Sequence, residues 1–233
     1  MQPSIHFYVL SLCDQTARLY EGFRDKLIDI QNTNFPLGIS IDTADPDSKN
    51  TQIREFFSRT DRHFAHYYQQ DPLPLVTVGE KSDLAVFLAL TTHKDAIIGT
   101  VNGNYSATST HDLGKIVWPV VKDAISGAKK NAMRDLAAAA EAKKVVSGID
   151  AVGQLMETEA GSTLYVEEDY HVKGSISKTH HSLIISKHVN IWEVIDDVVD
   201  LIIEQVLKMG GTVIFMNSGS LTKLERIALI PGK

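Results

Sequence analysis

Short apolar runs separated by polar turn residues open the chain and predict an antiparallel meander. Phe7 to Leu12 is rich in β-branched and aromatic residues, and Ala17 to Glu21 follows the polar residues Asp14 to Thr16 as its hairpin partner. Lys26 to Ile30 alternates polar and apolar positions and predicts a third strand. The segment 31–51 is rich in Asn, Asp, Thr and Pro, which predicts an irregular loop.

A helical period replaces this pattern in the middle of the chain. Apolar side chains between Gln52 and Gln69 fall on one stripe, which predicts a helix. A longer helical pattern runs from Thr110 to Lys144, with Pro119 inside it or near its start. Between these helices the sequence predicts a parallel strand, a helix with Ser82 as its N-cap and a second strand, over Pro74–Val78, Ser82–Thr91 and Ala96–Thr100.

A break at Val145 to Gly148 divides the pattern, and we predict two domains there, over residues 1–147 and 148–233. The second part predicts a short helix, a strand, a hairpin, a long amphipathic helix and two further strands. This order is typical of an α/β sandwich. The predicted elements are Ile149–Glu159, Ser162–Glu167, Val172–Ile176 with Leu183–Ser186, Ile191–Met209 ending at Gly210-Gly211, Thr212–Met216 and Ile227–Ile230.

Composition and charge narrow the class of protein. Of the 233 residues, 43% are hydrophobic and 22% are charged, as in a soluble globular protein. No apolar run is long enough to span a membrane, and the N-terminus does not resemble a signal peptide. We therefore expect a cytoplasmic protein with no membrane partner. Residues 149–233 carry 7 basic and 12 acidic side chains, which argues against unspecific nucleic-acid binding, and we expect no DNA partner.

Standard signatures of catalysis and of metal binding are absent from the sequence. There is no Gly-x-Ser-x-Gly elbow, phosphate-binding loop or His-Glu-x-x-His motif, and we expect no metal and no cofactor. The single cysteine, Cys13, predicts a buried structural thiol. His180, His181 and His188 do not form a ligand set, and the acidic residues of one predicted helix indicate a solvated face. Those acidic residues are Asp196, Asp197 and Asp200.

Basic residues gather on two of the predicted helices. Lys115, Lys122 and Lys129 are seven residues apart and share one helix face, and the arginines of the 52–69 helix lie off its apolar stripe. Two interpretations stay open: a solvated surface, or a ridge that contacts RNA phosphates. The RNA-facing candidates are Arg54, Arg59, Arg62, Lys115, Lys122 and Lys129.

The order of these segments resembles the bacterial proteins related to archaeo-eukaryotic class-one release factors. The resemblance covers about the whole chain. It is carried by Phe7-Tyr-Val-Leu-Ser-Leu, Pro74-Leu-Val-Thr-Val-Gly, Ile97-Ile-Gly-Thr-Val-Asn-Gly-Asn-Tyr, Trp118-Pro-Val-Val, Thr163-Leu-Tyr-Val-Glu and Gly210-Gly-Thr-Val-Ile-Phe.

This resemblance implies an RNase H-like mixed-sheet domain, matching the release factors' middle domain, followed by a smaller α/β/α sandwich. The second domain would resemble kink-turn-binding ribosomal proteins. The family's Gly-Gly-Gln loop should precede the helix at Ile53, but this chain has Asp47-Ser-Lys-Asn-Thr-Gln52 there. The motif uses glycine because its open φ/ψ range lets the backbone approach the peptidyl-tRNA ester. Gln52 is the one catalytic candidate, and a helix-start residue is the alternative.

The leading hypothesis is a non-catalytic, translation-related protein that binds the ribosome or structured RNA. The first alternative is a peptidyl-tRNA ester hydrolase that uses the 43–52 loop, and loss of peptide release in Gln52→Ala would support it. The second alternative is a protein-interaction module whose partner binds the acidic second domain. Salt-dependent ribosome binding separates the leading hypothesis from this module, because phosphate contacts weaken steeply as salt rises.

Overall fold

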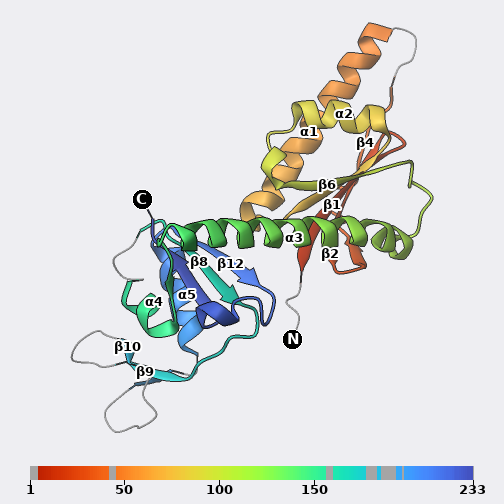
Figure 1. Cartoon of the computed structure of the whole chain (residues 1–233). Coiled ribbons are helices and arrows are strands. Elements are labelled where there is room, and N and C mark those ends of the chain that lie inside the picture. Colours follow the sequence, from red (N-terminus) through yellow and green to blue (C-terminus); the bar gives the residue numbers. More distant parts are fainter. Residues whose placement is uncertain are drawn as a thin grey trace. The chain divides into compact units, whose positions relative to one another are not determined.

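The chain folds into two compact units, one over residues 4–126 and one over residues 127–233 (Figure 1). The computed structural model describes residues 5–41, 46–155, 160–176, 183–184, 193–195 and 197–232. Each unit contains a β-sheet covered by helices, so the predicted two-part α/β fold is confirmed. The units divide inside a helix, earlier in the chain than 147/148, and the domain boundary at 147/148 stays a prediction.

The N-terminal unit is built on a mixed sheet with the order β3-β2-β1-β5-β6. The first three strands form the predicted antiparallel meander, and β1, β5 and β6 run parallel. A short strand, β4, pairs with the start of β2. The strands are β1 (His6–Cys13), β2 (Thr16–Phe23), β3 (Lys26–Asp29), β4 (Leu37–Gly38), β5 (Leu75–Gly79) and β6 (Ile97–Asn102).

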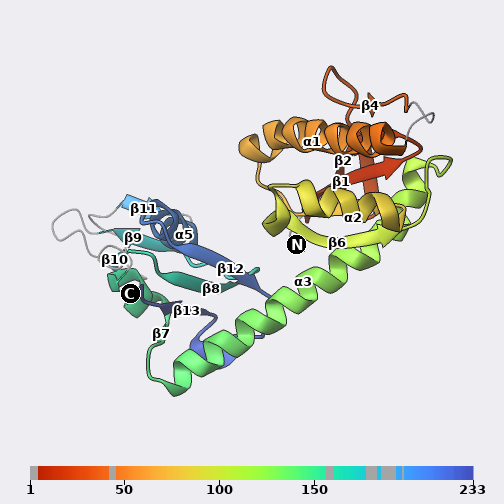
Figure 2. The ribbon, with the colours of Figure 1, turned by 90° about the horizontal axis from the view of Figure 1, so that it is seen from above.

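Helices cover both faces of this sheet, because side chains alternate along each strand (Figure 2). Leu10 and Leu12 of β1 pack on α1 (Pro46–Gln70) and α2 (Lys81–Leu90), with Phe57 and Phe64 in the same cluster. Phe7 and Val9 of β1 instead join a cluster with the first half of α3 (Thr110–Glu141). Pro119 lies within α3. A one-turn helix, η1 (Lys94–Ala96), precedes β6.

Two helices of this unit begin earlier than the sequence pattern predicts. Helix α1 starts at Pro46, so residues 46–51 are helical and the predicted 31–51 loop is wrong there. Proline is favoured at the first helical position, where its missing N–H costs nothing. The predicted N-cap Ser82 lies inside α2, whose N-cap is Glu80. Cys13 is buried, as expected.

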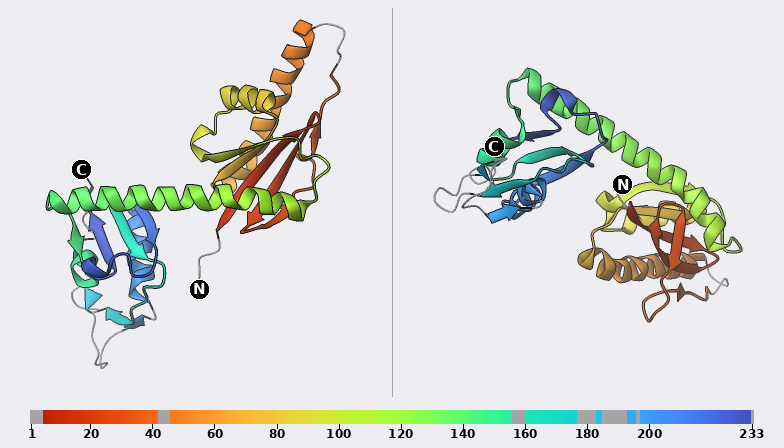
Figure 3. Two further views of the ribbon diagram at one scale, coloured as in Figure 1. Left: turned by 45° about the vertical axis from the view of Figure 1, so that its right-hand side comes forward. Right: turned by 90° about the horizontal axis from the view of Figure 1, so that it is seen from below.

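The C-terminal unit contains a four-stranded sheet with the order β12-β8-β13-β7. Leu164 and Val166 of β8 pack on α4 and α5, whereas Tyr165 between them packs with Ala132 and Leu136 of α3 on the other face. In Figure 3 the blue helix α5 lies against the strands of this sheet. The elements are β7 (Val146–Ser147), α4 (Ile149–Leu155), β8 (Thr163–Glu167), α5 (Val198–Lys208), β12 (Thr212–Met216), η2 (Thr222–Leu224) and β13 (Ile227–Ile230).

The predicted helix over Ile191–Met209 is wrong in its first part. The described residues contain a strand, β11 (Glu193–Ile195), and α5 begins only after Asp197. Asp197 caps α5 by accepting a hydrogen bond from the Val199 N–H at 3.0 Å. The predicted hairpin is confirmed where it is described, because β9 (Gly174–Ile176) pairs antiparallel with β10 (Leu183–Ile184). His180, His181, His188, Ile191 and Asp196 lie outside the described residues.

Candidate functional site

Gln52, the catalytic candidate, lies in the second turn of α1 rather than in a loop. Its side-chain amide donates a hydrogen bond to the Ser48 hydroxyl at 3.1 Å, one helical turn earlier. This i,i+4 contact runs along the helix surface, as is typical of a residue within a helix. Gln52 is thus a residue within a helix, whereas the alternative from the sequence places it at a helix start, and the helix begins at Pro46.

The three candidate arginines of α1 differ in their surroundings. Arg54 and Arg62 are exposed. Arg59 is half-buried, donates a hydrogen bond to the Gly38 carbonyl oxygen at 3.1 Å and lies 6.0 Å from the centre of the Phe56 ring. Arg59 therefore links α1 to β4, and Arg54 and Arg62 are the arginines of this group available to a phosphate.

The three candidate lysines of α3 also differ. Lys115 is exposed, with its ammonium 3.7 Å from the carboxylate of Asp112, and Lys122 is exposed beside Trp118, 6.0 Å from the ring centre. Lys129 belongs to the C-terminal unit, where it donates hydrogen bonds to Glu168 and, at 2.7 Å, to Asn217. The structure thus leaves Lys115 and Lys122 accessible and gives Lys129 partners within the fold.

We expect Lys129→Met to lower the free energy of unfolding of the C-terminal unit by about 1.5 kcal/mol, because the part-buried carboxylate of Glu168 loses its cation. Lys130→Met, at the exposed neighbouring position, should change it by less than about 0.5 kcal/mol. Urea unfolding of both variants measures the difference. Equal effects would show that the Lys129 contacts contribute nothing to stability.

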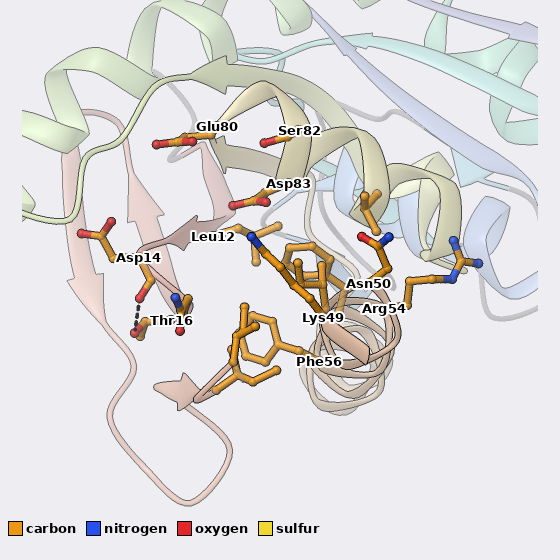
Figure 4. Close-up of a pocket in the computed structure, with 16 residues that line it drawn as sticks. Leu12, Asp14, Thr16, Lys49, Asn50, Arg54, Phe56, Glu80, Ser82 and Asp83 are labelled. Atoms are coloured by element: carbon orange, nitrogen blue, oxygen red, sulfur yellow. Dashed lines mark hydrogen bonds between the residues drawn. The ribbon is translucent and has the colours of Figure 1, made fainter. Parts of the chain in front are cut away.

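A cavity of about 700 Å³ lies at the carboxyl ends of β1 and β5, between α1 and the start of α2 (Figure 4). Its charged lining residues come from three parts of the chain: Asp14 follows β1, Lys49 and Arg54 belong to α1, and Glu80 and Asp83 lie at the start of α2. Among them, Arg54 is a candidate RNA contact from the sequence, and Lys49 lies in the 43–52 segment of the hydrolase alternative. The signal for Asp14, Glu80 and Asp83 is their position just after β1 and β5, two parallel strands, because open α/β sheets bind ligands there.

The carboxyl groups of this cavity have different electrostatic surroundings. Burial and the neighbouring Glu80 raise the pKa of Asp83, and the charge of Lys49 opposes this shift. Hydrogen bonds from Ser106 and Asn104 lower the pKa of Asp14. Within the described residues, the carboxylates of Glu80 and Asp83 form no hydrogen bond and no ion pair.

A second polar cluster in the N-terminal unit pairs a carboxylate with a histidine. The carboxylate of Asp61 accepts hydrogen bonds from the Thr91 hydroxyl at 2.5 Å and from the Thr92 N–H and hydroxyl at 3.1 and 2.8 Å, and it lies 2.9 Å from His93 Nδ1. The His93 ring packs edge-on against Phe64. These groups connect α1 to the segment after α2, which indicates a structural role.

Carboxylates of the C-terminal unit also hold loops. Glu167 is 2% exposed and accepts hydrogen bonds from Arg226 Nε at 2.8 Å and from the Leu221 N–H at 2.7 Å. Asp197 contacts His171, so the interpretation of Asp197 as part of a solvated face is wrong, although Asp200 is exposed.

Among the described residues, no three side chains of His, Cys, Asp or Glu are placed to hold a metal ion. None of the described helices is long and apolar enough to cross a membrane.

Comparison with known proteins gives a family and a fold. The sequence matches the model of bacterial archaeo-eukaryotic release factor family 3 over residues 6–158. No curated protein matches the sequence. The structure is similar to a chain of the ribosome-bound archaeal assembly of Pelota and ABCE1, with a TM-score of 0.59 and 13% identity over 97% of this chain and 61% of that chain.

Two further archaeal structures match over 98% of this chain. They are the translation termination factor aRF1, with 13% identity and a TM-score of 0.40, and Pelota from Archaeoglobus fulgidus, with 16% identity and a TM-score of 0.38. This chain spans 62% and 64% of their respective lengths. Because the family model covers more than half of the sequence, the chain belongs to bacterial archaeo-eukaryotic release factor family 3.

Proposed function

We propose that this protein is a non-catalytic, translation-related protein that binds the ribosome or structured RNA in the cytoplasm. Its membership of a release-factor family is the observation that carries the proposal. The fold that it shares with a chain of a ribosome-bound archaeal assembly supports the same role. The RNase H-like character of the N-terminal unit and a kink-turn-type C-terminal unit are part of this proposal.

The proposed RNA contacts are made by exposed cations of the N-terminal unit. Arg54 and Arg62 on α1, together with Lys115 and Lys122 on α3, are exposed. None of the four forms a short ion pair, and the 3.7 Å contact of Lys115 with Asp112 is the closest that any of them comes to a carboxylate within the described chain. Long, exposed cations of this kind contact phosphates and position RNA without reading its bases. Arg59 and Lys129 contribute less to the proposed contact surface, because they have partners in the fold.

The non-catalytic part of the proposal rests on the segment around Gln52. The sequence contains no Gly-Gly-Gln tripeptide, and residues 46–52 are helical. A backbone held in a helix lacks the conformational freedom that glycine provides at a close approach to an ester. The Gln52 amide is bonded to Ser48 of its own helix, which also disfavours the hydrolase alternative.

We expect the double variant Lys115→Glu and Lys122→Glu to bind ribosomes at least about tenfold more weakly than the unchanged protein. Each lost lysine–phosphate contact should also lower the salt slope of binding by about 1. Co-sedimentation with purified ribosomes measures both quantities. Both lysines are exposed, so the variant should keep the stability of the parent protein.

The control is Lys81→Glu with Lys94→Glu, which makes the same change of net charge at exposed positions outside α1 and α3. This control should bind ribosomes nearly as well as the unchanged protein. Equal weakening of both double variants would show only a net-charge effect. It would contradict the proposal that Lys115 and Lys122 of α3 contact the ribosome. Tight binding that does not depend on salt would favour a protein partner at the acidic C-terminal unit.

A further inference from the structure

The cavity at β1 and β5 lies where the chain leaves neighbouring strands in opposite directions. From β1 the chain turns into β2, which lies toward one edge of the sheet. From β5 it continues through α2 to β6, which lies toward the opposite edge. Connections that part in this way leave a crevice at the carboxyl ends of the two strands, and ligands bind there in open α/β sheets. A volume of about 700 Å³ is within the range of small-ligand sites.

The base of the cavity is apolar. Ile39, Ile41, Ile53 and Val86 line it, and each is half-buried, so part of each side chain remains open to the cavity. Phe57 also lines the cavity and is nearly fully buried. A ligand that covers these aliphatic side chains removes apolar surface from water, which favours a bound apolar group.

Charges of both signs surround this apolar base (Figure 4). Asp14, Glu80 and Asp83 come from the strand ends and the start of α2, whereas Lys49 and Arg54 come from α1. Within the described chain none of these five side chains forms a short ion pair, although the charge of Lys49 acts on Asp83. Because charges next to an apolar wall gain most from a direct partner, a ligand with both an ammonium and a carboxylate would complement the cavity.

We infer that this cavity binds a short peptide with a free amino group, a free carboxylate and an aliphatic or aromatic side chain between them. The ammonium faces Glu80 and Asp83, the carboxylate faces Lys49, and the side chain covers the isoleucines. A nucleotide fits less well, because its phosphates would meet three carboxylates. A simple organic cation would add a positive charge beside Lys49 and give that lysine no new partner. This inference does not depend on ribosome binding.

Calorimetric titration of the full chain with the tripeptide Ala-Leu-Ala tests the inference. N-acetylation of the peptide should weaken binding by about tenfold, because it removes the charge that pairs with Glu80 and Asp83. Amidation of its C-terminus should weaken binding to a similar extent. In the double variant Glu80→Gln and Asp83→Asn, acetylation should have little further effect, and in Lys49→Met the same should hold for amidation.

Two matched controls change the same side-chain types outside the cavity. Glu55→Gln on α1 and Lys81→Met on α2 are exposed positions that do not line it, and both variants should bind the free tripeptide like the parent protein. Absence of binding, or equal affinity for free and capped peptides in all variants, would overturn the inference. Binding of adenosine monophosphate that strengthens in Glu80→Gln with Asp83→Asn would also overturn it, since the site would then select anions.

Discussion

Replacing Asp61 by alanine is expected to lower the free energy of unfolding of the N-terminal unit by about 3 kcal/mol. Asp61 is 6% exposed, and its carboxylate accepts hydrogen bonds from Thr91 and Thr92 while pairing with His93. Its removal leaves the buried Thr91 hydroxyl and the part-buried donors of Thr92 and His93 without this acceptor. Native-state hydrogen exchange measures the loss, and peptides from 127–232 should keep their protection and serve as an internal reference.

Asp95→Ala, an exposed carboxylate in the same segment, is the control and should change stability by less than about 0.5 kcal/mol. The Asp61 effect should depend on pH. Burial raises the pKa of Asp61, but the hydrogen bonds from Thr91, His93 and Thr92 outweigh it and hold the pKa below its usual value of 3.8. The difference between Asp61→Ala and the parent should therefore be complete above that value and shrink as pH falls through the folded pKa. A constant difference down to pH 2 would contradict this.

Replacing Glu167 by alanine is expected to destabilise the C-terminal unit by about 3 kcal/mol. The side chain is buried and holds both Arg226 and the Leu221 N–H, which fixes the loop between β12 and β13. Without it, the buried Leu221 N–H has no acceptor and the Arg226 guanidinium keeps only Asp169, at 2.6 Å, in place of two carboxylates. Hydrogen exchange should report the largest loss of protection at residues 217–226.

Glu204→Ala provides the contrast for Glu167, because Glu204 forms an exposed ion pair with Lys208 one helical turn away. Such surface pairs contribute little to stability, so the variant should lose no more than about 0.5 kcal/mol. If Glu167→Ala and Glu204→Ala behaved alike, the Glu167 contacts would not be what holds the 217–226 loop in place.

Local pattern alone was enough to predict most strands and the long helix α3. Phe7 to Leu12, Leu75 to Val78 and Thr212 to Met216 combine high β-propensity with turn residues at their ends, and each forms a strand. The apolar stripe of α3 has a helical period over many residues, so a single proline at 119 did not obscure it. Apolar side chains of β1 point alternately to the two faces of the sheet, which explains why helices cover both faces.

Helix starts were harder to predict, because the apolar period continues past them. Val194 and Ile195 match the helical spacing of Val198 and Ile202, although the first two belong to strand β11. Asp197 was the available signal, since an aspartate before an apolar run is a typical N-cap. Pro46 gave a similar signal for α1 that the polar composition of 31–51 concealed.

The cavity and the role of Lys129 could not be predicted from sequence, because both depend on contacts between distant segments. Lys129 shares its helix face and spacing with Lys122, and only the fold brings Glu168 and Asn217 to it. Asp14 and Glu80 match no motif in the sequence, and the pairing of β1 with β5 brings them to one cavity.

Co-sedimentation of the purified protein with ribosomes over a range of salt concentrations tests the proposed role most directly. Four phosphate contacts, from Arg54, Arg62, Lys115 and Lys122, predict binding at low salt whose logarithm falls linearly with the logarithm of salt concentration, with a slope of about −3. No binding at the lowest salt concentration, or binding that stays constant as salt rises, would contradict a ribosome-associated role carried by these residues.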